Sequence, residues 1–428
     1  MCGIAGLFQR EASVDEQILT AMRDIIVHRG PDAGDNFIDG PLGFGHRRLS
    51  IIDVGGGHQP MATPDGRFVI CYNGEIYNYQ ALRAELEQAG VRFRTHSDTE
   101  VILWLHATAN GAAEVVSKLN GIFAYALWDR QSRKLLLARD RAGIKPLYYA
   151  AGSQGLAFAS EIKALFESRL VTPKVNEARI AEYLVFRQVA GPENLFDGVM
   201  VLPPGHTMTV TAGVPDAPRR YWTVQEPVEP FRGSYQDAVD ALDARLNAAV
   251  KGQLMSEVPL GTFCSGGIDS SLTSAIAAKH SSRAINTFSV GFHEAAWDES
   301  AYARLASRAC GSIHHELRID EAEYASMLPR LVWHHDLPLN FANSVHIFAV
   351  SKLARQHVTV VLTGEGADEL FGGYPRYYIP RLLGHLQKIP GFMRNGMVRM
   401  LAGSGDHRLR KLARFAGRSA DDTLLFNC

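Results

Sequence analysis

Short apolar runs separated by Gly, Pro and Asn-Gly fill the first 210 residues, and this pattern predicts β-strands. The runs lie at 43–53, 68–75, 123–129, 134–140 and 146–150. Apolar residues at helical spacing interrupt them twice, at 78–89 and at 98–110. Because strands predominate and helices are few, we expect sheets covered by helices, an α+β arrangement.

Beyond residue 235 the pattern alternates between amphipathic helices and short apolar strands. Helices are predicted at 236–254, 270–280, 299–310 and 344–357, and strands at 258–264, 285–292 and 358–363. This alternation favours a parallel sheet of the doubly wound kind. Between the two halves, residues 223–233 contain two prolines and no apolar period, so we expect a linker there.

Composition narrows the class of protein. The chain has 428 residues, 46% of them hydrophobic and 21% charged, with a net charge of −1. We therefore expect a globular protein of two or three domains without a field that recruits nucleic acid or a membrane. From residue 376 onward ten Lys and Arg face three Asp. A solvated helical face is favoured there, and a polyanion-binding surface is the alternative.

Five scattered cysteines without a CxxC pair argue against a disulfide framework and a zinc knuckle. No apolar run approaches the ~20 residues of a membrane span, and the N-terminus lacks a basic segment before an apolar stretch. We expect a protein of the reducing cytoplasm.

The strongest local signal is a strand that runs into Ser265-Gly-Gly-Ile-Asp-Ser270 and then into a helix. Glycines let the backbone approach a phosphate, hydroxyls donate hydrogen bonds, and the first helical N–H groups point at the anion. Asp269 would repel a phosphate unless a divalent cation lies between them, so the loop predicts a nucleotide with Mg²⁺. A generic glycine turn is the alternative.

This loop resembles that of the N-type ATP pyrophosphatases, which split ATP between the α and β phosphates and adenylate a substrate. Residues 360–374 form a second strand-to-glycine-loop element that carries Glu365 and Asp368. Because a parallel sheet exposes the carboxyl ends of its strands to ligands, the two acid-bearing loops form a plausible metal site.

Cys2 directly follows the initiator methionine. Removal of Met1 would leave a residue that carries both a thiol and a free α-amine. An α-amine titrates at roughly 7.7–8.0, close enough to neutral pH to take the thiol proton through water and return it. A cysteine at this position by chance is the alternative.

Four further segments accompany Cys2: His28-Arg-Gly-Pro-Asp32, Arg48 to Asp53, Asn73-Gly-Glu75 and Ser97 to Glu100. Together they resemble the glutaminase domain of class II amidotransferases. With the second half, the chain from Cys2 to about Tyr374 is similar to the glutamine-hydrolysing asparagine synthetase family. The resemblance implies an N-terminal nucleophile hydrolase sandwich (αββα) followed by an α/β doubly wound, parallel-sheet ATP pyrophosphatase domain. The implied bounds are 2–212 for the glutaminase domain, 213–235 for the linker and 236–428 for the synthetase domain.

The resemblance also implies roles in glutamine hydrolysis. Cys2 would be the nucleophile, and the Asn73 side chain with the Gly74 N–H would form an oxyanion hole, where one donor is typically worth ~3–4 kcal/mol. Arg48 offers a planar fork to the α-carboxylate of glutamine, while Asp98 and Glu75 could take its α-ammonium. Glutamine contacts are carried over to Arg48, Leu49, Ser50, Ile51, Ile52, Asn73, Gly74, Glu75 and Asp98. The alternatives are a hairpin turn at Asn-Gly and surface salt bridges for the charged residues.

For the second half the resemblance implies an ATP site. Adenosine would lie near Phe263, Val290, Thr363 and Gly364, and pyrophosphate on Ser265, Gly266, Gly267, Asp269 and Ser270. Mg²⁺ would bind Asp269 and Asp368. Glu365 would act in acyl-adenylate formation and ammonia attack, where a carboxylate can orient or deprotonate the amine; a helix N-cap is the alternative.

The implied activity is an ATP-dependent carbon–nitrogen ligase that uses glutamine as the amido donor for aspartate and releases AMP and pyrophosphate. Another carboxylate acceptor, a cyclase reaction, or a glutaminase that only senses ATP are the alternatives. The partners are therefore glutamine and aspartate or another acceptor, with no nucleic acid and no membrane, and a homodimer is left open. Residues 336–346 are expected to line the acceptor site.

Two expectations concern the remaining sequence. Family members continue past residue 428 with a Lys-x-Asp-Arg element that nothing in 376–428 matches, so the synthetase domain is expected to be truncated at its C-terminus. The pairs His314-His315 and His334-His335 invite a metal interpretation, but adjacent side chains on a strand or helix point apart.

Overall fold

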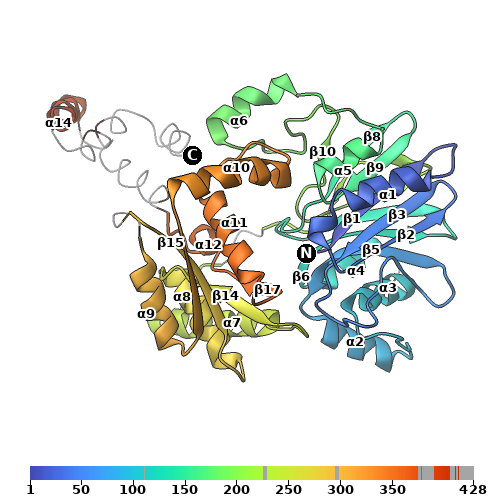
Figure 1. Ribbon diagram of the computed structural model, residues 1–428, viewed down its shortest axis with the longest axis horizontal. Helices are drawn as coiled ribbons and strands as arrows, with labels where there is room; N and C mark the ends of the chain where they lie inside the picture. The colour runs from blue at the N-terminus through green and yellow to red at the C-terminus, as the bar shows by residue number, and fades with distance from the viewer. Residues whose placement is uncertain are drawn as a thin grey trace.

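In the computed structural model, the chain forms two α/β parts that lie against one another (Figure 1). The structure describes residues 1–428 except 110, 225–228, 295–297, 375–376, 378–389, 405–409, 411–412 and 414–428. Most of the basic C-terminal segment and the expected truncation lie outside the described residues, apart from the helix α14 (Gly391–Ala402). Within the described parts of the chain, no helix is long and apolar enough to cross a membrane.

Two antiparallel sheets stack in the first part. One is six-stranded, in the order β10-β8-β9-β1-β3-β2, and the other is seven-stranded, in the order β12-β11-β7-β6-β5-β4 with β13 beside β11. Their strands are β1 (Gly3–Gln9), β2 (Ala33–Asp39), β3 (Leu42–Arg48), β4 (Met61–Ala62), β5 (Phe68–Ile76), β6 (Gly121–Asp129), β7 (Lys134–Arg139), β8 (Tyr148–Gly152), β9 (Gly155–Ala159), β10 (Met200–Val201), β11 (His206–Thr211), β12 (Val214–Pro215) and β13 (Arg219–Arg220).

The main core of this part lies between the two sheets, where Phe8, Phe44 and Trp128 are buried. Helices cover the outer faces. The helices α1 (Glu16–Asp24) and α5 (Ile162–Glu167) pack on the six-stranded sheet, and α2 (Tyr79–Gln88), α3 (Asp98–Thr108) and α4 (Ala112–Lys118) pack on the seven-stranded sheet. Alternating apolar strands bury one face against the partner sheet and the other against helices, which confirms the expected αββα sandwich.

The expectation of only two helices in this half is wrong, because α1, α4, α5 and α6 (Ile180–Phe186) are also helical. The helix α1 could have been predicted, because Ile18, Leu19 and Met22 lie at helical spacing, and Leu19 and Met22 are buried. The helices α4, α5 and α6 have only six or seven residues each, which is too short for a helical period to show in the sequence. The strands at 214–215 and 219–220, inside the expected linker of 213–235, pair with β11, and the predicted domain bounds stay a prediction.

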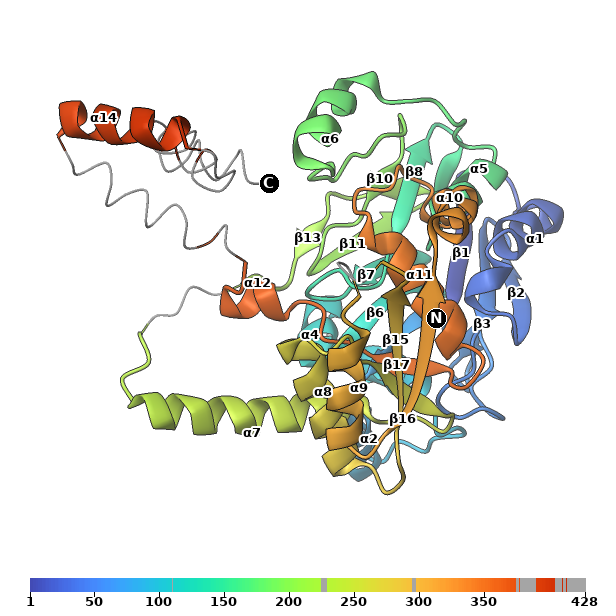
Figure 2. The same ribbon diagram turned by 60° about the vertical axis from the view of Figure 1, so that its left-hand side comes forward.

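The second part has a four-stranded parallel sheet in the order β16-β15-β14-β17. The helices α7, α8 and α9 lie on one face and α11 on the other, which confirms the doubly wound arrangement (Figure 2). The elements are α7 (Tyr235–Gln253), β14 (Leu260–Phe263), α8 (Ile268–His280), β15 (Asn286–Phe292), α9 (Ser300–Ala309), β16 (Ile313–Ile319), α10 (Glu321–His335), α11 (Asn343–Ala354), β17 (Val360–Leu362) and α12 (Ala367–Phe371).

The sequence pattern missed β16 and α10. The strand β16 reads Ile-His-His-Glu-Leu-Arg-Ile and lies at the sheet edge, where only Ile319 is buried. An edge strand exposed to water lacks the continuous apolar run of a buried parallel strand. The helix α10 contains Pro329 in its interior, and a proline there normally interrupts a helical pattern.

The strand order fixes where the loops of the second part meet. From β14, the next two strands in sequence, β15 and β16, extend the sheet on one side, whereas β17 lies on the other side of β14. The direction in which the chain adds strands therefore switches between β14 and β17. Ligands of open α/β sheets bind at the carboxyl ends of the strands at such a switch point. The loops that follow β14 and β17 therefore face a common site.

Candidate active sites

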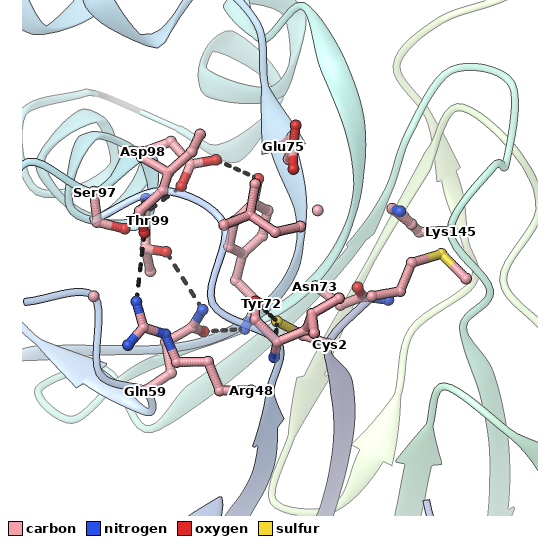
Figure 3. Close-up of a pocket in the computed structure, with 16 residues that line it drawn as sticks. Cys2, Arg48, Gln59, Tyr72, Asn73, Glu75, Ser97, Asp98, Thr99 and Lys145 are labelled. Carbon is pink, nitrogen blue, oxygen red and sulfur yellow. Dashed lines mark hydrogen bonds between the residues drawn. The ribbon is translucent and has the colours of Figure 1, made fainter. Parts of the chain in front are cut away.

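Cys2 lies just before β1, an inner strand of the six-stranded sheet, and its thiol contacts the backbone of Leu49. The Leu49 N–H donates to Sγ at 3.4 Å, and the thiol donates to the Leu49 carbonyl at 3.6 Å. We call the narrow space beside it, of about 50 Å³, the thiol cavity (Figure 3). It is lined by Met1, Cys2, Arg48, Leu49, Ile51, Ile52, Gly57, Gln59, Tyr72, Asn73, Gly74, Glu75, Ser97, Asp98, Thr99 and Lys145.

Asn73 on β5 is the most unusual residue of the thiol cavity. Its side chain is 1% exposed, and neither its amide nitrogen nor its amide oxygen has a hydrogen-bond partner. An unpaired buried polar group costs roughly 1–3 kcal/mol, so such groups are rare. The amide is thus ready to donate to a group that enters the cavity. Asn73 and Gly74 lie inside β5, paired with β6, which excludes the alternative of a hairpin turn.

Gly74 is required by close packing. A β-carbon at this position would lie 2.3 Å from the Ile122 carbonyl oxygen on β6. Any side chain here would separate the two strands and move the backbone of Asn73 away from the thiol.

Arg48 ends β3 and is held by a loop of backbone carbonyls. Its Nη1 donates to the Val54 carbonyl at 3.0 Å, and its Nη2 donates to the Asp53 carbonyl at 2.6 Å and the Ile52 carbonyl at 3.4 Å. Three of the five guanidinium donors are therefore engaged, and the others remain for a ligand. The residue is 5% exposed, which contradicts a surface salt bridge.

The same loop is held from the second part of the molecule. The carboxylate of Glu257, ahead of β14, accepts hydrogen bonds from the backbone N–H of Asp53 at 2.9 Å and of Val54 at 3.2 Å. The Glu257 N–H in turn donates to the Ile51 carbonyl at 3.1 Å. The loop that positions Arg48 thus depends on both parts.

Two acids face the cavity opposite Arg48. Asp98, in the first turn of α3, accepts hydrogen bonds from the Tyr72 hydroxyl at 2.7 Å and the Ile76 N–H at 3.0 Å. Burial raises the pKa of Asp98. Burial, and then repulsion from Asp98, raises the pKa of Glu75 to about 7. An incoming ammonium would relieve this repulsion.

Sequence reasoning missed Lys145, Gln59 and Tyr72, which also line the thiol cavity. Lys145 is 6% exposed, and burial lowers its pKa to about 8. Its backbone N–H is held by the Asp140 carboxylate at 2.9 Å. Asp140 precedes a glycine turn at Gly143, and an acid before such a turn was the only signal that could have drawn attention to this loop.

The environment of the thiol depends on Met1. With Met1 in place, burial raises the pKa of the Cys2 thiol, and the nearby N-terminal amine opposes the shift only in part. Burial likewise lowers the pKa of the Met1 amine to about 5. Because the Met1 side chain lines the narrow cavity, its removal would open space beside the thiol.

Nearly all residues expected to contact glutamine meet at this cavity, and their roles stay predictions. Ser50 is the exception, since it does not line the cavity and its N–H donates to the Asp32 carboxylate at 2.8 Å. The residues that do line it are Cys2, Arg48, Leu49, Ile51, Ile52, Asn73, Gly74, Glu75 and Asp98.

A larger cavity of about 300 Å³ lies at the carboxyl ends of β14 and β17, and we call it the serine-loop cavity. The Ser265 and Ser270 hydroxyls lie 3.0 Å apart across the loop. Gly266 has a φ of +87°, a conformation that favours glycine. Gly267 caps α8, and a β-carbon there would meet nothing closer than the Ser265 hydroxyl at 3.5 Å. The loop therefore leaves an open cradle in front of the helix N-terminus.

Gly364 brings the second loop against the first. A β-carbon on Gly364 would lie 2.9 Å from the backbone nitrogen of Ser270. Glu365 and Asp368 follow and line the serine-loop cavity. The N-cap of α12 is Gly366, so Glu365 is not a helix cap.

Of the residues expected to bind ATP or metal, all but Gly266 line the serine-loop cavity, and so does Glu365, which is expected to act on the acyl-adenylate. The ATP and metal residues that line it are Phe263, Ser265, Gly267, Asp269, Ser270, Val290, Thr363, Gly364 and Asp368. Cys264, Phe288 and Tyr374 also line it and were not predicted. Of the segment 336–346, expected to line an acceptor site, only His346 does so.

The adjacent side chains of His314 and His315 have different partners. His314 contacts the Thr287 and Ser289 hydroxyls, whereas His315 contacts Asn286 and stacks on His357. His334 packs against His28 of the first part. Within the described residues, no group of three or more His, Cys, Asp and Glu is arranged to hold a metal ion.

Comparison with known proteins covers both parts. A family model described as a glutamine amidotransferase domain matches residues 1–222, and one described as asparagine synthase matches residues 241–424. Asparagine synthetase [glutamine-hydrolyzing] 1 of Bacillus subtilis is 38% identical over 407 residues, 94% of this chain and 63% of that protein.

Two further relatives are similar over most of the chain. A putative asparagine synthetase [glutamine-hydrolyzing] of Mycobacterium bovis is 37% identical over 93% of this chain and 64% of that protein. An amidase, chry2, of Gibberella zeae is 32% identical over 85% of this chain and 56% of that protein. The chain thus spans just under two thirds of the length of the first two relatives.

Proposed function

Because the chain belongs to the glutamine-hydrolysing asparagine synthetase family, we propose that it hydrolyses glutamine at Cys2 and uses the ammonia to amidate an ATP-activated carboxylate, most simply that of aspartate. The observation that supports this proposal most strongly is the buried, partnerless amide of Asn73 beside the Cys2 thiol. A carboxamide carbonyl attacked by sulfur develops an oxyanion that would give this amide its missing partner.

In the proposed first step, Met1 has been removed and the α-amine of Cys2 takes the thiol proton. Sulfur attacks the glutamine carboxamide carbon, and Asn73 with the Gly74 N–H stabilises the oxyanion. The α-amine returns the proton to the departing ammonia, and water then hydrolyses the thioester to glutamate. The free donors of Arg48 would hold the α-carboxylate, and Asp98 with Glu75 the α-ammonium.

In the proposed second step, ATP occupies the serine-loop cavity. Ser265, Gly267 and Ser270 would bind the phosphates at the N-terminus of α8, with adenosine against Phe263 and Val290. The substrate carboxylate attacks the α-phosphorus and pyrophosphate leaves. Glu365 would then orient ammonia for attack on the acyl-adenylate, releasing the amide and AMP.

The residues present fit a magnesium ion. Asp269 and Asp368 come from two neighbouring loops and face the same cavity as the phosphate-binding hydroxyls. Carboxylate oxygens together with phosphate oxygens are the ligands that Mg²⁺ prefers. When bound, Mg²⁺ would neutralise charge on the polyphosphate. Location of the protein in the cytoplasm and its assembly into a homodimer are further proposals.

The test is a two-readout assay on the purified 428-residue chain. Glutamate is measured with glutamine alone, and pyrophosphate is measured with ATP, Mg²⁺, aspartate and either glutamine or ammonium. Glutamate and aspartate-dependent pyrophosphate together support the proposal. Glutamate without pyrophosphate for aspartate or for a panel of other carboxylates would instead identify a glutaminase that lacks ligase activity.

A second candidate differs only in the acceptor. The relative from Gibberella zeae is named an amidase rather than an asparagine synthetase, although it matches most of this chain. If pyrophosphate release requires a carboxylate other than aspartate, that acceptor replaces aspartate in the proposal.

A further inference from the structure

A row of buried charges crosses from the first part of the molecule to the second. The Glu161 carboxylate, just before α5, accepts hydrogen bonds from His28 Nε2 and Arg29 Nη1, each at 2.9 Å. It also pairs with the ammonium of Lys163. That ammonium lies 2.9 Å from Oδ1 of Asp336, at the end of α10. Lys163 is therefore shared between carboxylates of the two parts.

Burial makes this row more consequential than a surface salt bridge. The side chains of Glu161, Lys163 and Asp336 are 8%, 9% and 10% exposed. The Trp333 ring of α10 also covers the Lys163 ammonium, 4.6 Å from the ring centroid. Charges shielded from water interact strongly, and loss of one leaves its partner uncompensated.

One end of the row reaches the nucleophile. Arg29, whose side chain is 9% exposed, donates from Nε to the Cys2 carbonyl at 3.1 Å. The same guanidinium is oriented by its Nη1 contact with Glu161. A shift of the Glu161 carboxylate would therefore move the group that holds the Cys2 backbone.

The other end is fixed to the second part. Asp336 caps α10 with a φ of +60°, a left-handed conformation that is uncommon for a non-glycine residue. Its Oδ2 accepts the Lys163 backbone N–H at 3.2 Å, so the carboxylate holds both ends of Lys163. The chain then continues into α11, which contributes His346, Ile347 and Val350 to the serine-loop cavity.

We propose that Lys163 and Asp336 are positioning residues for glutamine hydrolysis: through Glu161 and Arg29 they set the Cys2 backbone according to the placement of α10 and α11. This inference rests on the proposed function. It assigns no contact with substrate to Lys163 or Asp336. Glutamine hydrolysis at the thiol cavity would then respond to the packing of α10 and of α11, the helix that lines the serine-loop cavity.

The test compares Lys163→Met and Asp336→Asn with Lys174→Met and Asp197→Asn. The control pair has a similar Nζ–oxygen distance of 2.8 Å, but it is exposed and lies within the first part. The first readout is steady-state glutamine hydrolysis by the full chain. We expect kcat to fall at least tenfold in Lys163→Met and Asp336→Asn with KM within twofold, and no change in the control variants.

Three measurements separate positioning from loss of folding. Melting curves show whether each variant is folded, and Lys163→Arg should recover at least half of the lost kcat. The double variant Lys163→Met/Asp336→Asn should have a kcat no lower than that of the more impaired single variant, because both substitutions break the same row of buried charges. Pyrophosphate release supported by ammonium should stay within twofold in Lys163→Met. Unchanged kcat in folded variants, or additive losses, would overturn the proposal.

A further readout does not depend on the proposed activity. The rate at which iodoacetamide alkylates Cys2, followed by mass spectrometry of the N-terminal peptide, should change at least threefold in Lys163→Met but not in Lys174→Met. If the unaltered chain fails to hydrolyse glutamine, the proposed function is rejected and this rate alone decides the positioning role. Equal rates would reject that role as well.

Discussion

The carboxylate of Glu257 lies 2.9 Å from the backbone nitrogen of Asp53, a residue 204 positions earlier in the chain. The Asp53 carbonyl in turn accepts a hydrogen bond from the Arg48 guanidinium. A side chain at the start of the strand that carries the serine loop therefore supports the residue proposed to bind the α-carboxylate of glutamine.

Substitution of Glu257 by Ala should weaken glutamine binding. Two backbone N–H groups lose their acceptor, and each exposed hydrogen bond is worth about 0.5–1.5 kcal/mol. We expect KM for glutamine to rise roughly three- to tenfold with little change in kcat, because the loop around Arg48 loosens while the thiol and Asn73 stay in place. Steady-state glutaminase assays measure this. Glu257→Gln keeps one acceptor oxygen, so its KM should lie between those of the natural chain and Glu257→Ala. An unchanged KM in Glu257→Ala would contradict this prediction.

The α-amine of Cys2 should be essential as well as its thiol. Cys2→Ala should remove glutamine hydrolysis while ammonium-supported pyrophosphate release remains. A chain extended by Gly-Ser ahead of Cys2 keeps the thiol but moves the free amine away, and it should also be inactive as a glutaminase. Glutamate formation and N-terminal mass are the measurements. A fully active extended chain would show that another group takes the thiol proton.

Glutamine binding should release protons near neutral pH. The pKa of Glu75 is raised to about 7, so the carboxyl is largely protonated below that pH and cannot attract an ammonium. Bound glutamine should lower this pKa, so that up to about half a proton leaves at pH 7, where the free carboxyl is half protonated, and KM falls as pH rises through about 7. Calorimetry in buffers of different ionisation enthalpy measures the release. Glu75→Gln should abolish it; equal release in that variant would assign the proton elsewhere.

The same shift has a consequence for stability. Because the folded-state pKa of Glu75 lies above its ordinary value, its contribution is fully present below about pH 4.5 and is lost as pH rises through about 7. Relative to the natural chain, Glu75→Gln should therefore gain about 3 kcal/mol of unfolding free energy at pH 8 and little at pH 4.5. Urea unfolding at the two pH values checks the sign.

Gly267→Ala should separate nucleotide binding from stability. The added methyl would meet no protein atom closer than 3.5 Å, so unfolding free energy should change by less than about 0.5 kcal/mol. It would occupy the cradle in front of α8, and ATP affinity should fall at least tenfold in equilibrium binding. Gly252→Ala in α7, with nothing within 4 Å, is the matched control and should bind ATP normally. Normal binding by Gly267→Ala would place the phosphates elsewhere.

Much of the fold could be predicted because buried elements carry strong periodic signals. The helices α7, α8, α9 and α11 and the strands β14, β15 and β17 lie close to their expected ranges. Two of the missed elements have local features that argue against them: β16 is a solvent-exposed edge strand, and α10 contains a proline and few buried residues. Their stability comes from tertiary contacts that no local window contains.

The candidate sites divide in the same way. Residues with a distinctive neighbourhood, such as Cys2 behind Met1 or the glycines around Ser265, could be found from sequence. Lys145 could not, because its importance comes from burial beside Glu75 and Cys2 after folding. Glu257 and Asp336 are ordinary acids in sequence and matter only through contacts that join distant segments.

The unpaired amide of Asn73 implies a trade-off between activity and robustness. A folded chain that buries such a group is less stable than it could be, and the deficit is largest when no ligand lies in the thiol cavity. Asn73→Leu, of similar size, should therefore melt at a higher temperature than the natural chain although it hydrolyses no glutamine. A glutamine analogue that places an oxyanion in the cavity should raise the melting temperature of the natural chain and leave that of the leucine variant unchanged.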